Sequence, residues 1–558
     1  MKACKVNEDF HIVVVGGGTA GWLTACLLAA DHGQSNGKHY LQTKTQGTSV
    51  RVTLVESPNI ASIGVGEGTW PSMRSTLQRI GISEKEFLLR CNASFKQGSC
   101  FQGWRTGDSS DWYYHPFSLP EGYPQHDHSC GWLPFQEQVS FTNALSAQGR
   151  MCDLAKAPKT ATTPDYAFAL NYGYHLDAGK FADLLTEHGT QQLNIQHIRD
   201  DVVKIVTETG QARAPIQAIT TQQNGAIKGD LFIDCTGFKG LLIEQHFQVE
   251  RAQLATPLLN DRAVAMQVPY VHEQAPIASA TLATALSSGW IWDIGLPTRR
   301  GVGMVYSSAF LSADQAELQL RKHIDNTLAQ PSSQSTVAAN TAASLSDAQR
   351  AAILKDITAR HITLSTGIRK TFWVENCVAV GLSAGFIEPL EASAIALIET
   401  SASFISDNLP LAAQDTPFIA KRFNQTMTHH WHRIIDFLKL HYVLSQRSDS
   451  DYWYAQRQLD NCSDWLRENL QLWQRRSPNL HDLSMNTDMF PAASWQYIWF
   501  GMQQGQLPFL AAPPTPVSGG SEQVIDRAQL AFQRVANKTR SLAQTLPSNR
   551  ELLAHICQ

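Results

Sequence analysis

The sequence predicts a mixed α/β (α+β) fold, and three observations carry this prediction. A run of four apolar residues, 12–15, leads straight into a glycine-rich turn and then into an alanine- and leucine-rich helix at 22–30. Two later apolar runs, within 230–237 and 376–385, also stop at small residues. From about residue 416 onward the periodicity is mainly helical. Strands that end in small-residue turns beside helices are typical of a nucleotide-binding sheet built from distant segments.

Length, composition and charge limit the class of protein. The 558 residues exceed what one hydrophobic core usually fills, so we expect at least two structural modules. Apolar residues make up 43% and charged residues 17%, as in ordinary globular proteins. The net charge of -4 gives no reason to expect a nucleic-acid partner.

Targeting and metal-binding signals are missing from the sequence. There is no apolar core of signal-peptide length before the first strand and no run of about 18 apolar residues. We therefore expect a cytoplasmic protein without a membrane span. The ten cysteines contain no C-x-x-C pair, and the histidines within 101–174 lack partners at zinc-like spacing. Neither a disulfide framework nor a metal site is expected.

The first strand and helix are joined by Gly16, Gly18 and Gly21 in the spacing G-x-G-x-x-G, with Thr19 and Ala20 before the last glycine. Glycines let the turn be sharp and let the backbone approach a pyrophosphate, whose charge is stabilised by the N–H groups at the helix start. The motif alone is weak evidence, but its position between a strand and a helix predicts a bound dinucleotide.

A second apolar strand, 51–55, ends at Glu56, where a dinucleotide fold normally places an acid on the adenosine ribose. The interval from Gly16 is longer than usual, and we interpret the polar residues 32–49 as an inserted surface loop. The alternative is a glutamate that lies in solvent at a strand end.

Residues 63–71 form a glycine-dense loop that contains Gly66 and Thr69. Such a loop either lies flat against a ligand or serves as a connector. Helices are expected next, at 72–80 and 83–91. Lys96 then lies among small and aromatic residues, and two interpretations stay open: a surface lysine with a packed stem, or a buried lysine with a displaced pKa and a chemical role.

The middle of the chain is less regular. The pattern predicts loops and short strands from 101 to 174 and a helix at 175–188. Trp290 and Trp292 stand at i and i+2, so in a strand both rings project to one side and form an aromatic wall. The alternative for this pair is ordinary core packing.

The stretch 376–395 is an apolar strand followed by small residues, with Gly381 in the turn. A long helix is expected from about Glu391 to residue 409, directly after Leu390. Its first N–H groups would face an anion or the edge of a flavin. The alternative role for Glu391 is to complement the helix dipole.

The cofactor-facing stretches near residues 16, 235 and 385 are far apart, so we expect one discontinuous domain with inserted modules, as in large FAD enzymes. No second strand and G-x-G-x-x-G unit is visible for a nicotinamide, so the flavin is expected to arrive reduced from a separate reductase. The expected parts are an FAD-binding domain of 1–100, 170–265 and 355–415, substrate-side strands and loops at 101–169 and 266–326, a linker or insertion at 327–345, and a helical substrate module at 416–558.

Five of these stretches together resemble the flavin-dependent tryptophan halogenases, over most of the first 445 residues. They are GGGTAGW at 16–22, GVGEGT at 64–69, NASFK at 92–96, W-x-W-x-I at 290–294 and NCVAVGLSAGFIEPLEAS at 376–393. The resemblance implies an FAD-binding Rossmann-like domain of the aromatic flavin monooxygenase type with a mostly helical substrate-side module.

In that family, reduced FAD and oxygen form a flavin hydroperoxide that halide attacks, and hypohalous acid passes through a tunnel to a lysine beside the aromatic substrate. By resemblance Lys96 is this lysine, and Glu391 is the acid near the substrate carbon. Ser393 and Ala394 match positions whose backbone donors hold chloride or bromide. Trp290 and Trp292 would keep the substrate away from the flavin.

The resemblance and the motifs together imply FAD, supplied as FADH2 by a transient flavin reductase, and a set of cofactor-binding residues. These are Gly16, Gly18, Thr19, Ala20, Gly21, Glu56, Gly66, Thr69, Gly381 and Leu390.

The sequence departs from the family pattern at two places. Gly295 follows W-x-W-x-I where the family has proline, and residues 392–394 read Ala-Ser-Ala where it has serine, threonine and glycine. The residues that would clamp a tryptophan are not identified, with 452–454 as candidates. Free tryptophan, another indole and a tryptophan in a peptide therefore stay open, as do the halide, the ring position and a homodimer.

Two other functions also stay open. One is an aromatic flavin monooxygenase, which would hydroxylate its substrate. The other is a flavin-binding regulatory protein without turnover.

Overall fold

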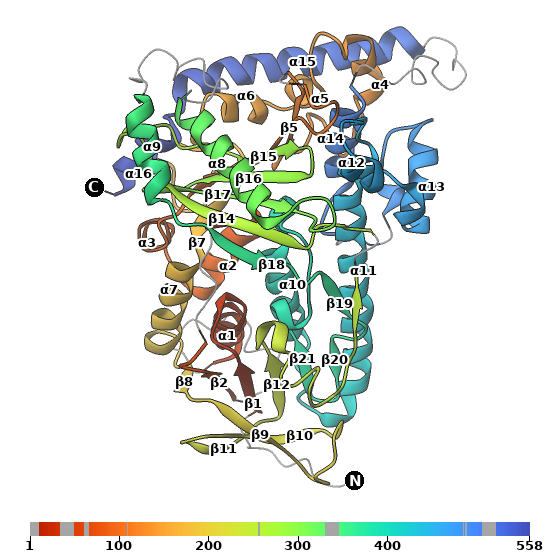
Figure 1. Cartoon of the computed structure of the whole chain (residues 1–558). Coiled ribbons are helices and arrows are strands. Elements are labelled where there is room, and N and C mark those ends of the chain that lie inside the picture. Colours follow the sequence, from red (N-terminus) through yellow and green to blue (C-terminus); the bar gives the residue numbers. More distant parts are fainter. Residues whose placement is uncertain are drawn as a thin grey trace. The chain divides into compact units, whose positions relative to one another are not determined.

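The computed structural model describes residues 10–33, 49–60, 66–108, 110–254, 257–329, 345–483, 485, 488–504 and 520–557. The chain divides into two compact units, and Figure 1 labels their helices and strands where there is room. Unit 1 consists of Met1–Asn92, Leu176–Leu254 and Ser365–Trp431, and unit 2 consists of Ala93–His175, Ala255–Leu364 and His432–Gln558.

Unit 1 is built on a six-stranded sheet with the order β20-β21-β12-β1-β2-β8. Neighbouring strands are parallel except β20, which runs antiparallel to β21. The strands are β1 (Phe10–Val15), β2 (Val50–Glu56), β8 (Gln196–Arg199), β12 (Leu231–Asp234), β20 (Trp373–Val374) and β21 (Cys377–Ala379).

The central strand β1 is buried on both faces, which explains why its sequence is a continuous apolar run. On one face Val13 and Val15 pack with Ile216 and Ile219 of a small antiparallel sheet, β11-β10-β9. The other face lies against α1, which also contacts α7 and α10. The turns that leave the sheet are thereby held between two covering layers.

The other elements of unit 1 are helices, two small sheets and the single strand β3, which pairs with β7. They are α1 (Thr19–His32), β3 (Gly66–Gly68), α2 (Ser72–Ile80), α3 (Glu84–Arg90), α7 (Ala178–Gln191), β9 (Val202–Thr207), β10 (Ile216–Thr221), β11 (Gly225–Lys228), β13 (Arg251–Gln253), β19 (Gly367–Arg369), β22 (Gly385–Phe386) and α10 (Ala394–Asp407). Two elements cross the division of the chain, β7 (Gly173–Asp177) after His175 and α11 (Thr416–Val443) after Trp431.

Unit 2 is built on a seven-stranded sheet with the order β18-β14-β17-β16-β15-β5-β6. It is antiparallel apart from the parallel pair β5 and β15. The strands are β5 (Gly98–Gln102), β6 (Trp112–Pro116), β14 (Arg262–Pro269), β15 (Thr281–Leu286), β16 (Gly289–Gly295), β17 (Arg299–Tyr306) and β18 (Arg360–Thr363). The short strand β4 (Ser94–Lys96) pairs with β7 outside this sheet.

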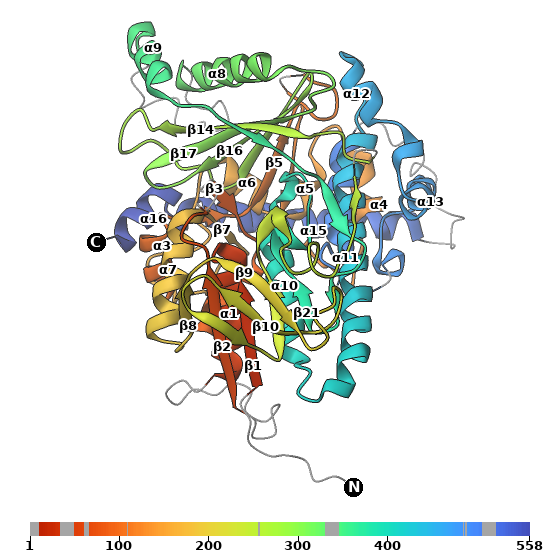
Figure 2. The same cartoon turned by 60° about the horizontal axis from the view of Figure 1, so that its bottom comes forward.

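Helices cover unit 2. α8 and α9 lie over the strands β14, β16 and β17 (Figure 2), with Leu320 and Ile324 of α8 packed on Ile291 of β16. α14 packs on β6, and α15 lies along α4, α5 and α6 (Figure 1). The helices are α4 (Ser129–Trp132), α5 (Phe141–Leu145), α6 (Gln148–Asp153), α8 (Ala313–Ala329), α9 (Asp347–Asp356), α12 (Asp451–Gln456), α13 (Asp464–Trp473), α14 (Ala492–Met502), α15 (Gly520–Thr545) and α16 (Asn549–Ile556).

The α/β prediction is confirmed, one local prediction is wrong, and one helix was missed. The helix expected at 175–188 begins only at Ala178, because the Asp177 side chain accepts hydrogen bonds from the N–H groups of Gly179 and Lys180 and thus caps α7. His175 lies in a strand instead. Helix α16 was not expected, although Ser548 and Glu551 form its capping box.

Other predicted segments fall largely on residues outside the described ranges. Of the loop expected at 32–49, His32 belongs to α1 and 34–48 are not described. Of the linker expected at 327–345, residues 327–329 continue α8 and 330–344 are not described. In the described ranges, no helix combines the length and apolarity needed to cross a membrane.

Candidate functional site

The turn after β1 is shaped by three glycines with different surroundings. Gly16 has φ +118°, and a Cβ on it would lie 2.2 Å from the carbonyl oxygen of Cys235. A Cβ on Gly21 would lie 1.8 Å from the carbonyl oxygen of Gly16. Gly18, in contrast, faces open space. The first and last glycines therefore permit close backbone packing, and the middle one leaves room for a ligand.

Helix α1 begins immediately after this open position. Gly18 is its N-cap and offers no side-chain cap, and Thr19 and Ala20 lie in a first turn without an acidic residue. The first N–H groups of a helix have no partner within the helix. This helix start is therefore suited to bind an anion such as a pyrophosphate.

Glu56 closes one side of the same turn. A Cβ on Gly17 would overlap the Glu56 carboxylate, at 1.5 Å from Oε2, so the acid lies directly against the glycine turn. His197 Nε2 lies 2.8 Å from Glu56 Oε1, and the Arg199 guanidinium lies 3.8 Å from it. The carboxylate is thus held in place at the end of β2, and its bond to a ribose stays a prediction.

The turns after β12 and β21 meet the first turn. A Cβ on Gly381 would lie 2.6 Å from the Cβ of Ala20, and Gly381 has φ +70°. Ser383 donates to Asp234 Oδ1 at 3.0 Å, and the other oxygen of Asp234 accepts from the N–H groups of Leu242 and Ile243 at 2.8 Å. Asp234 was not among the predicted residues, and it fixes these turns rather than facing a ligand.

Glu391 does not lie in the first turn of a helix, so that prediction is wrong. α10 begins at Ala394, and Glu391 lies in a short turn with left-handed φ values, +67° at Glu391 and +54° at Ala392. Such values are strained for residues other than glycine. The indole of Trp70 donates to the Glu391 carbonyl oxygen at 2.8 Å and helps to hold the turn.

The predicted residues around this turn have different exposures. Leu390, Glu391 and Ser393 are buried, whereas Ala394 is exposed at the start of α10. Ser393 is the N-cap of α10, whose first turn lacks an acid. An anion fits such a helix start, and halide binding there stays a prediction.

Thr69 is buried, and Gly66 lies in β3. Both come just before Trp70, so the Trp70 hydrogen bond connects their segment to the turn of Leu390 and Glu391. The glycine turn, Gly381 and Glu56 form a second group within unit 1.

Lys96 belongs to unit 2, and its side chain is only 1% exposed. The surface alternative is therefore wrong. Its Nζ lies 5.5 Å from the centre of the Phe117 ring, and Lys96 is paired with Gly173 of β7. The strand is fixed by Ser94, which donates to the Gly295 carbonyl oxygen, and by Asn549, which donates to the Phe95 carbonyl oxygen at 3.1 Å.

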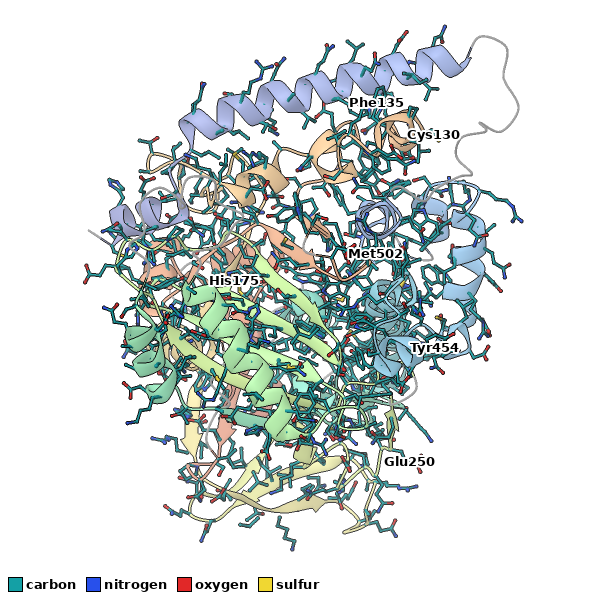
Figure 3. The ribbon with its side chains drawn as sticks, turned by 45° about the horizontal axis from the view of Figure 1, so that its top comes forward. Cys130, Phe135, His175, Glu250, Tyr454 and Met502 are labelled. Atoms are coloured by element: carbon teal, nitrogen blue, oxygen red, sulfur yellow. The ribbon has the colours of Figure 1, made fainter. Side chains whose placement is uncertain are left out.

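His175 is a neighbour of Lys96 that the sequence did not reveal. It pairs with Ser94, and so lies on the same face of the β4 and β7 pair as Lys96. His175 (labelled in Figure 3) is buried, and its Nε2 lies 2.8 Å from Thr281 Oγ1. Burial, together with the charge of Lys96, lowers the pKa of His175 well below its usual value. The imidazole is therefore neutral near pH 7.

Trp290 and Trp292 project to the same side of β16, opposite Ile291. Their ring centres are 6.3 Å apart, and Trp290 also lies 6.1 Å from Trp104. The Trp292 ring covers Gly303 on β17, where a Cβ would lie 2.1 Å from it. The pair forms an aromatic surface within unit 2.

Metal ligands do not gather within the described part of the chain. It contains no group of three or more His, Cys, Asp or Glu side chains placed to hold a metal ion. The described cysteines are free thiols.

The sequence model of the tryptophan halogenase family matches residues 11–514. The chain belongs to the tryptophan halogenase family. It is 30% identical over 578 residues to tryptophan 7-halogenase KtzQ of Kutzneria sp. (strain 744), with 99% of each chain covered. Enzymes of this family are flavin-dependent and work with a separate flavin reductase.

Solved structures agree with this assignment. The crystal structure of tryptophan halogenase from Shewanella frigidimarina NCIMB 400 matches with a TM-score of 0.87 and 44% identity, covering 99% of this chain and 98% of that chain. BrvH, a flavin-dependent halogenase from Brevundimonas sp. BAL3, matches with a TM-score of 0.78 and 28% identity, covering 98% and 99%. The chain is a flavin-dependent halogenase of the same fold, and its open glycine turn and uncapped α1 fit the FAD that the family implies.

Substitution of two glycines tests the cofactor turn. Gly16→Ala should lower the unfolding temperature, because its Cβ would meet the Cys235 carbonyl at a positive φ. Gly18→Ala should nearly preserve that temperature and weaken FAD binding by about tenfold, because a methyl group would fill the open space in front of α1. Thermal unfolding of the apoprotein and FAD titration measure the two effects. Equal effects of both substitutions on both measurements would contradict this description of the turn.

Proposed function

We propose that this enzyme uses FADH2, oxygen and chloride or bromide to halogenate the ring of tryptophan or another indole, with Lys96 and Glu391 as catalytic residues. The burial of the Lys96 side chain is the observation that carries the proposal, because a lysine shielded from water can handle a reactive halogen species. The relative named above as a tryptophan 7-halogenase supports an indole ring as the substrate.

FAD, when bound in its reduced form, supplies with oxygen and halide the hypohalous acid that the reaction requires. The residues of unit 1 bind and orient the cofactor. The N–H groups at the start of α1 would bind the pyrophosphate, and Glu56 would accept a hydrogen bond from the ribose. The N–H groups at Ser393 and Ala394 would hold the halide.

Lys96 would make the halogen electrophilic. As an ammonium it can donate a hydrogen bond to hypohalous acid, and as an amine it can take the halogen to form a haloamine and release water. Both roles require exclusion of bulk water, which the 1% exposure of Lys96 provides. The neutral His175 beside it adds no second positive charge.

Glu391 would orient the halogenating species or accept the proton that the ring carbon loses. In the overall reaction an aromatic C–H and hypohalous acid give an aromatic carbon–halogen bond and water. Glu391 is only 6% exposed, and its backbone is held by the left-handed turn and by Trp70. A fixed position is what a proton acceptor needs.

Trp290 and Trp292 would form a wall that keeps the organic substrate away from the flavin. Their rings lie on one side of β16, and the Trp292 ring packs directly on Gly303 of the neighbouring strand, where there is no side chain. Separation of the substrate from the flavin would disfavour hydroxylation, which is the reaction of the alternative class of flavin enzyme.

Replacement of Lys96 tests its role directly. Lys96→Ala and Lys96→Met should oxidise FADH2 at the wild-type rate but lower the yield of halogenated indole per FADH2 oxidised by about a hundredfold or more. Product mass and oxygen consumption are measured together. Lys439→Met is the matched control, because Lys439 is equally buried in unit 2 and donates to the Gln456 carbonyl oxygen. An unaltered yield in the Lys96 variants would refute the assigned role.

Replacement of Glu391 by its isostere tests the acid. Glu391→Gln keeps the size of the side chain and removes the proton acceptor, so the yield per FADH2 oxidised should fall by about a hundredfold. The unfolding temperature should change little. A variant that retains the wild-type yield would show that the carboxylate takes no part in the reaction.

A further inference from the structure

Glu399 is a buried carboxyl group that the reaction as described does not use. It lies on α10, about two helical turns after Glu391, and is only 4% exposed. Its two oxygens accept hydrogen bonds from two hydroxyl groups on α2: Oε2 from Ser72 Oγ at 2.8 Å, and Oε1 from Thr76 Oγ1. Within the described residues it forms no salt bridge. A carboxyl group in such a position needs a reason, because burial without a cation is costly.

The two helices that Glu399 joins are the ones next to the proposed catalytic turn. α2 begins two residues after Trp70, and α10 begins three residues after Glu391. The Trp70 indole donates to the Glu391 carbonyl oxygen. Segments 70–76 and 391–399 are therefore tied together at two points, one of which can gain or lose a proton.

The opposite end of α2 is fixed in a different way. Arg79 pairs with the buried Asp31 of α1, and Asp31 also accepts a hydrogen bond from Ser406 of α10. That attachment is an ion pair whose carboxylate also accepts a hydrogen bond from a hydroxyl group. The attachment at the N-terminal end of α2 depends instead on Glu399 and its two hydroxyl partners.

Burial raises the pKa of Glu399 from 4.5 to about 7, and the hydrogen bonds from Thr76 and Ser72 oppose this shift. The elements packed against α10 include α1 and α2, whose charged groups are Asp31, His32, Arg74 and Arg79. None of these is a cause of the shift. On β3, burial also raises the pKa of Glu67 to about 7, so a second carboxyl group can titrate in the same range.

We propose that Glu399 is a positioning residue, a latch between α2 and α10 that holds the Trp70 segment against the turn of Glu391. The neutral carboxyl group can donate to one hydroxyl and accept from the other, so both partners are satisfied. The role rests on the proposed function of Glu391, because that turn is what the latch would keep in place. Ser72 and Thr76, one helical turn apart, form the other half of the latch.

The direction of the pH effect follows from linkage. The closed latch holds its proton more tightly than an opened one, in which the carboxyl group is solvated with a pKa near 4.5. Stabilisation by the latch is complete below about pH 4.5 and is lost as pH rises through about 7. The equilibrium constant for opening therefore rises about tenfold per pH unit between about pH 4.5 and 7 and is constant above this range. The total rise is about two powers of ten or more.

Glu399→Gln is the decisive variant, because glutamine imitates the protonated acid and cannot ionise. Amide hydrogen exchange of the apoprotein, corrected for the intrinsic rate at each pH, measures the opening of residues 72–76. Variant and wild type should have similar protection near pH 5, and at pH 8 the variant should be protected about ten- to hundredfold better. Glu86→Gln on the exposed surface of α3 is the control and should leave protection of 72–76 unchanged. Equal protection of Glu399→Gln and wild type at both pH values would overturn the proposal.

A second variant guards against a folding defect. Thr76→Val keeps the size of the side chain and removes one hydroxyl, so protection of 72–76 should fall at every pH while its pH dependence persists. Unchanged protection in this variant would also overturn the proposal.

The link to the reaction is measured separately, with chemically reduced FAD so that no reductase contributes to the pH profile. The yield of halogenated product per FADH2 oxidised should be at least about twofold higher in Glu399→Gln than in wild type at pH 8 and equal near pH 5. If the variant and wild type have the same ratio of yields at pH 8 as at pH 5, while hydrogen exchange changes as predicted, the latch does not position Glu391. That result would overturn the positioning role. Lack of product in wild type would instead refute the proposed function, while the exchange measurement would still decide whether the latch exists.

Discussion

The burial of the Lys96 side chain is the constraint on which the proposed chemistry depends. A lysine in an apolar interior loses its hydration, which is costly. The side chain therefore stays buried only if the surrounding structure prevents it from moving to solvent. Unit 2 fixes the strand of Lys96 from three directions: β7 pairs with it, Gly295 accepts from Ser94, and Asn549 donates to the Phe95 carbonyl oxygen. These contacts come from segments far apart in the sequence. The lysine is therefore placed by the fold of the whole unit rather than by its local sequence.

In unit 1 the proposed ligand contacts are made by the backbone, so the path of the backbone is what the packing must fix. Close packing of Gly16 on Cys235 and of Gly21 on Gly16 brings the start of α1 to the end of the sheet. The turn at Glu391 uses left-handed backbone without glycine, which costs about 1–3 kcal/mol and persists only where neighbours hold it. The Trp70 hydrogen bond and the contact between α2 and α10 supply that hold. The helices α1, α2 and α10, which follow or hold the glycine turn and the Glu391 turn, thus contact one another in one layer.

Much of unit 1 could be predicted because its signals are local. The spacing of Gly16, Gly18 and Gly21 between an apolar strand and a helix reflects a backbone requirement that few other structures share. In unit 2, the capping box of Ser548 and Glu551 is an equally local signal, and α16 could have been predicted from it. The strand of His175 was missed because Leu176 fits the apolar repeat of the helix that follows. Asp177 caps that helix, which therefore begins only at Ala178.

The rest depends on contacts that no local pattern contains. The Phe117 ring lies beside the Lys96 ammonium group and Asn549 holds the strand of Lys96, and nothing in NASFK indicates either residue. The left-handed φ of Glu391 runs against local propensity, which explains why a helix was expected to begin there. Glu399 looks like an ordinary helical residue until α2, more than three hundred residues earlier, is placed against it. Such positions are where function departs from local preference.

In the proposed reaction the substrate receives a halogen rather than an oxygen atom. The most direct measurement is the mass of the product that the wild-type enzyme forms from free tryptophan, indole and a tryptophan-containing peptide, with a flavin reductase, NADH, FAD and bromide. We predict a brominated ring in at least one substrate and no bromination when bromide is omitted. A product with one added oxygen and no halogen, whether or not bromide is present, would contradict the account, as would oxidation of FADH2 without modification of any of these substrates.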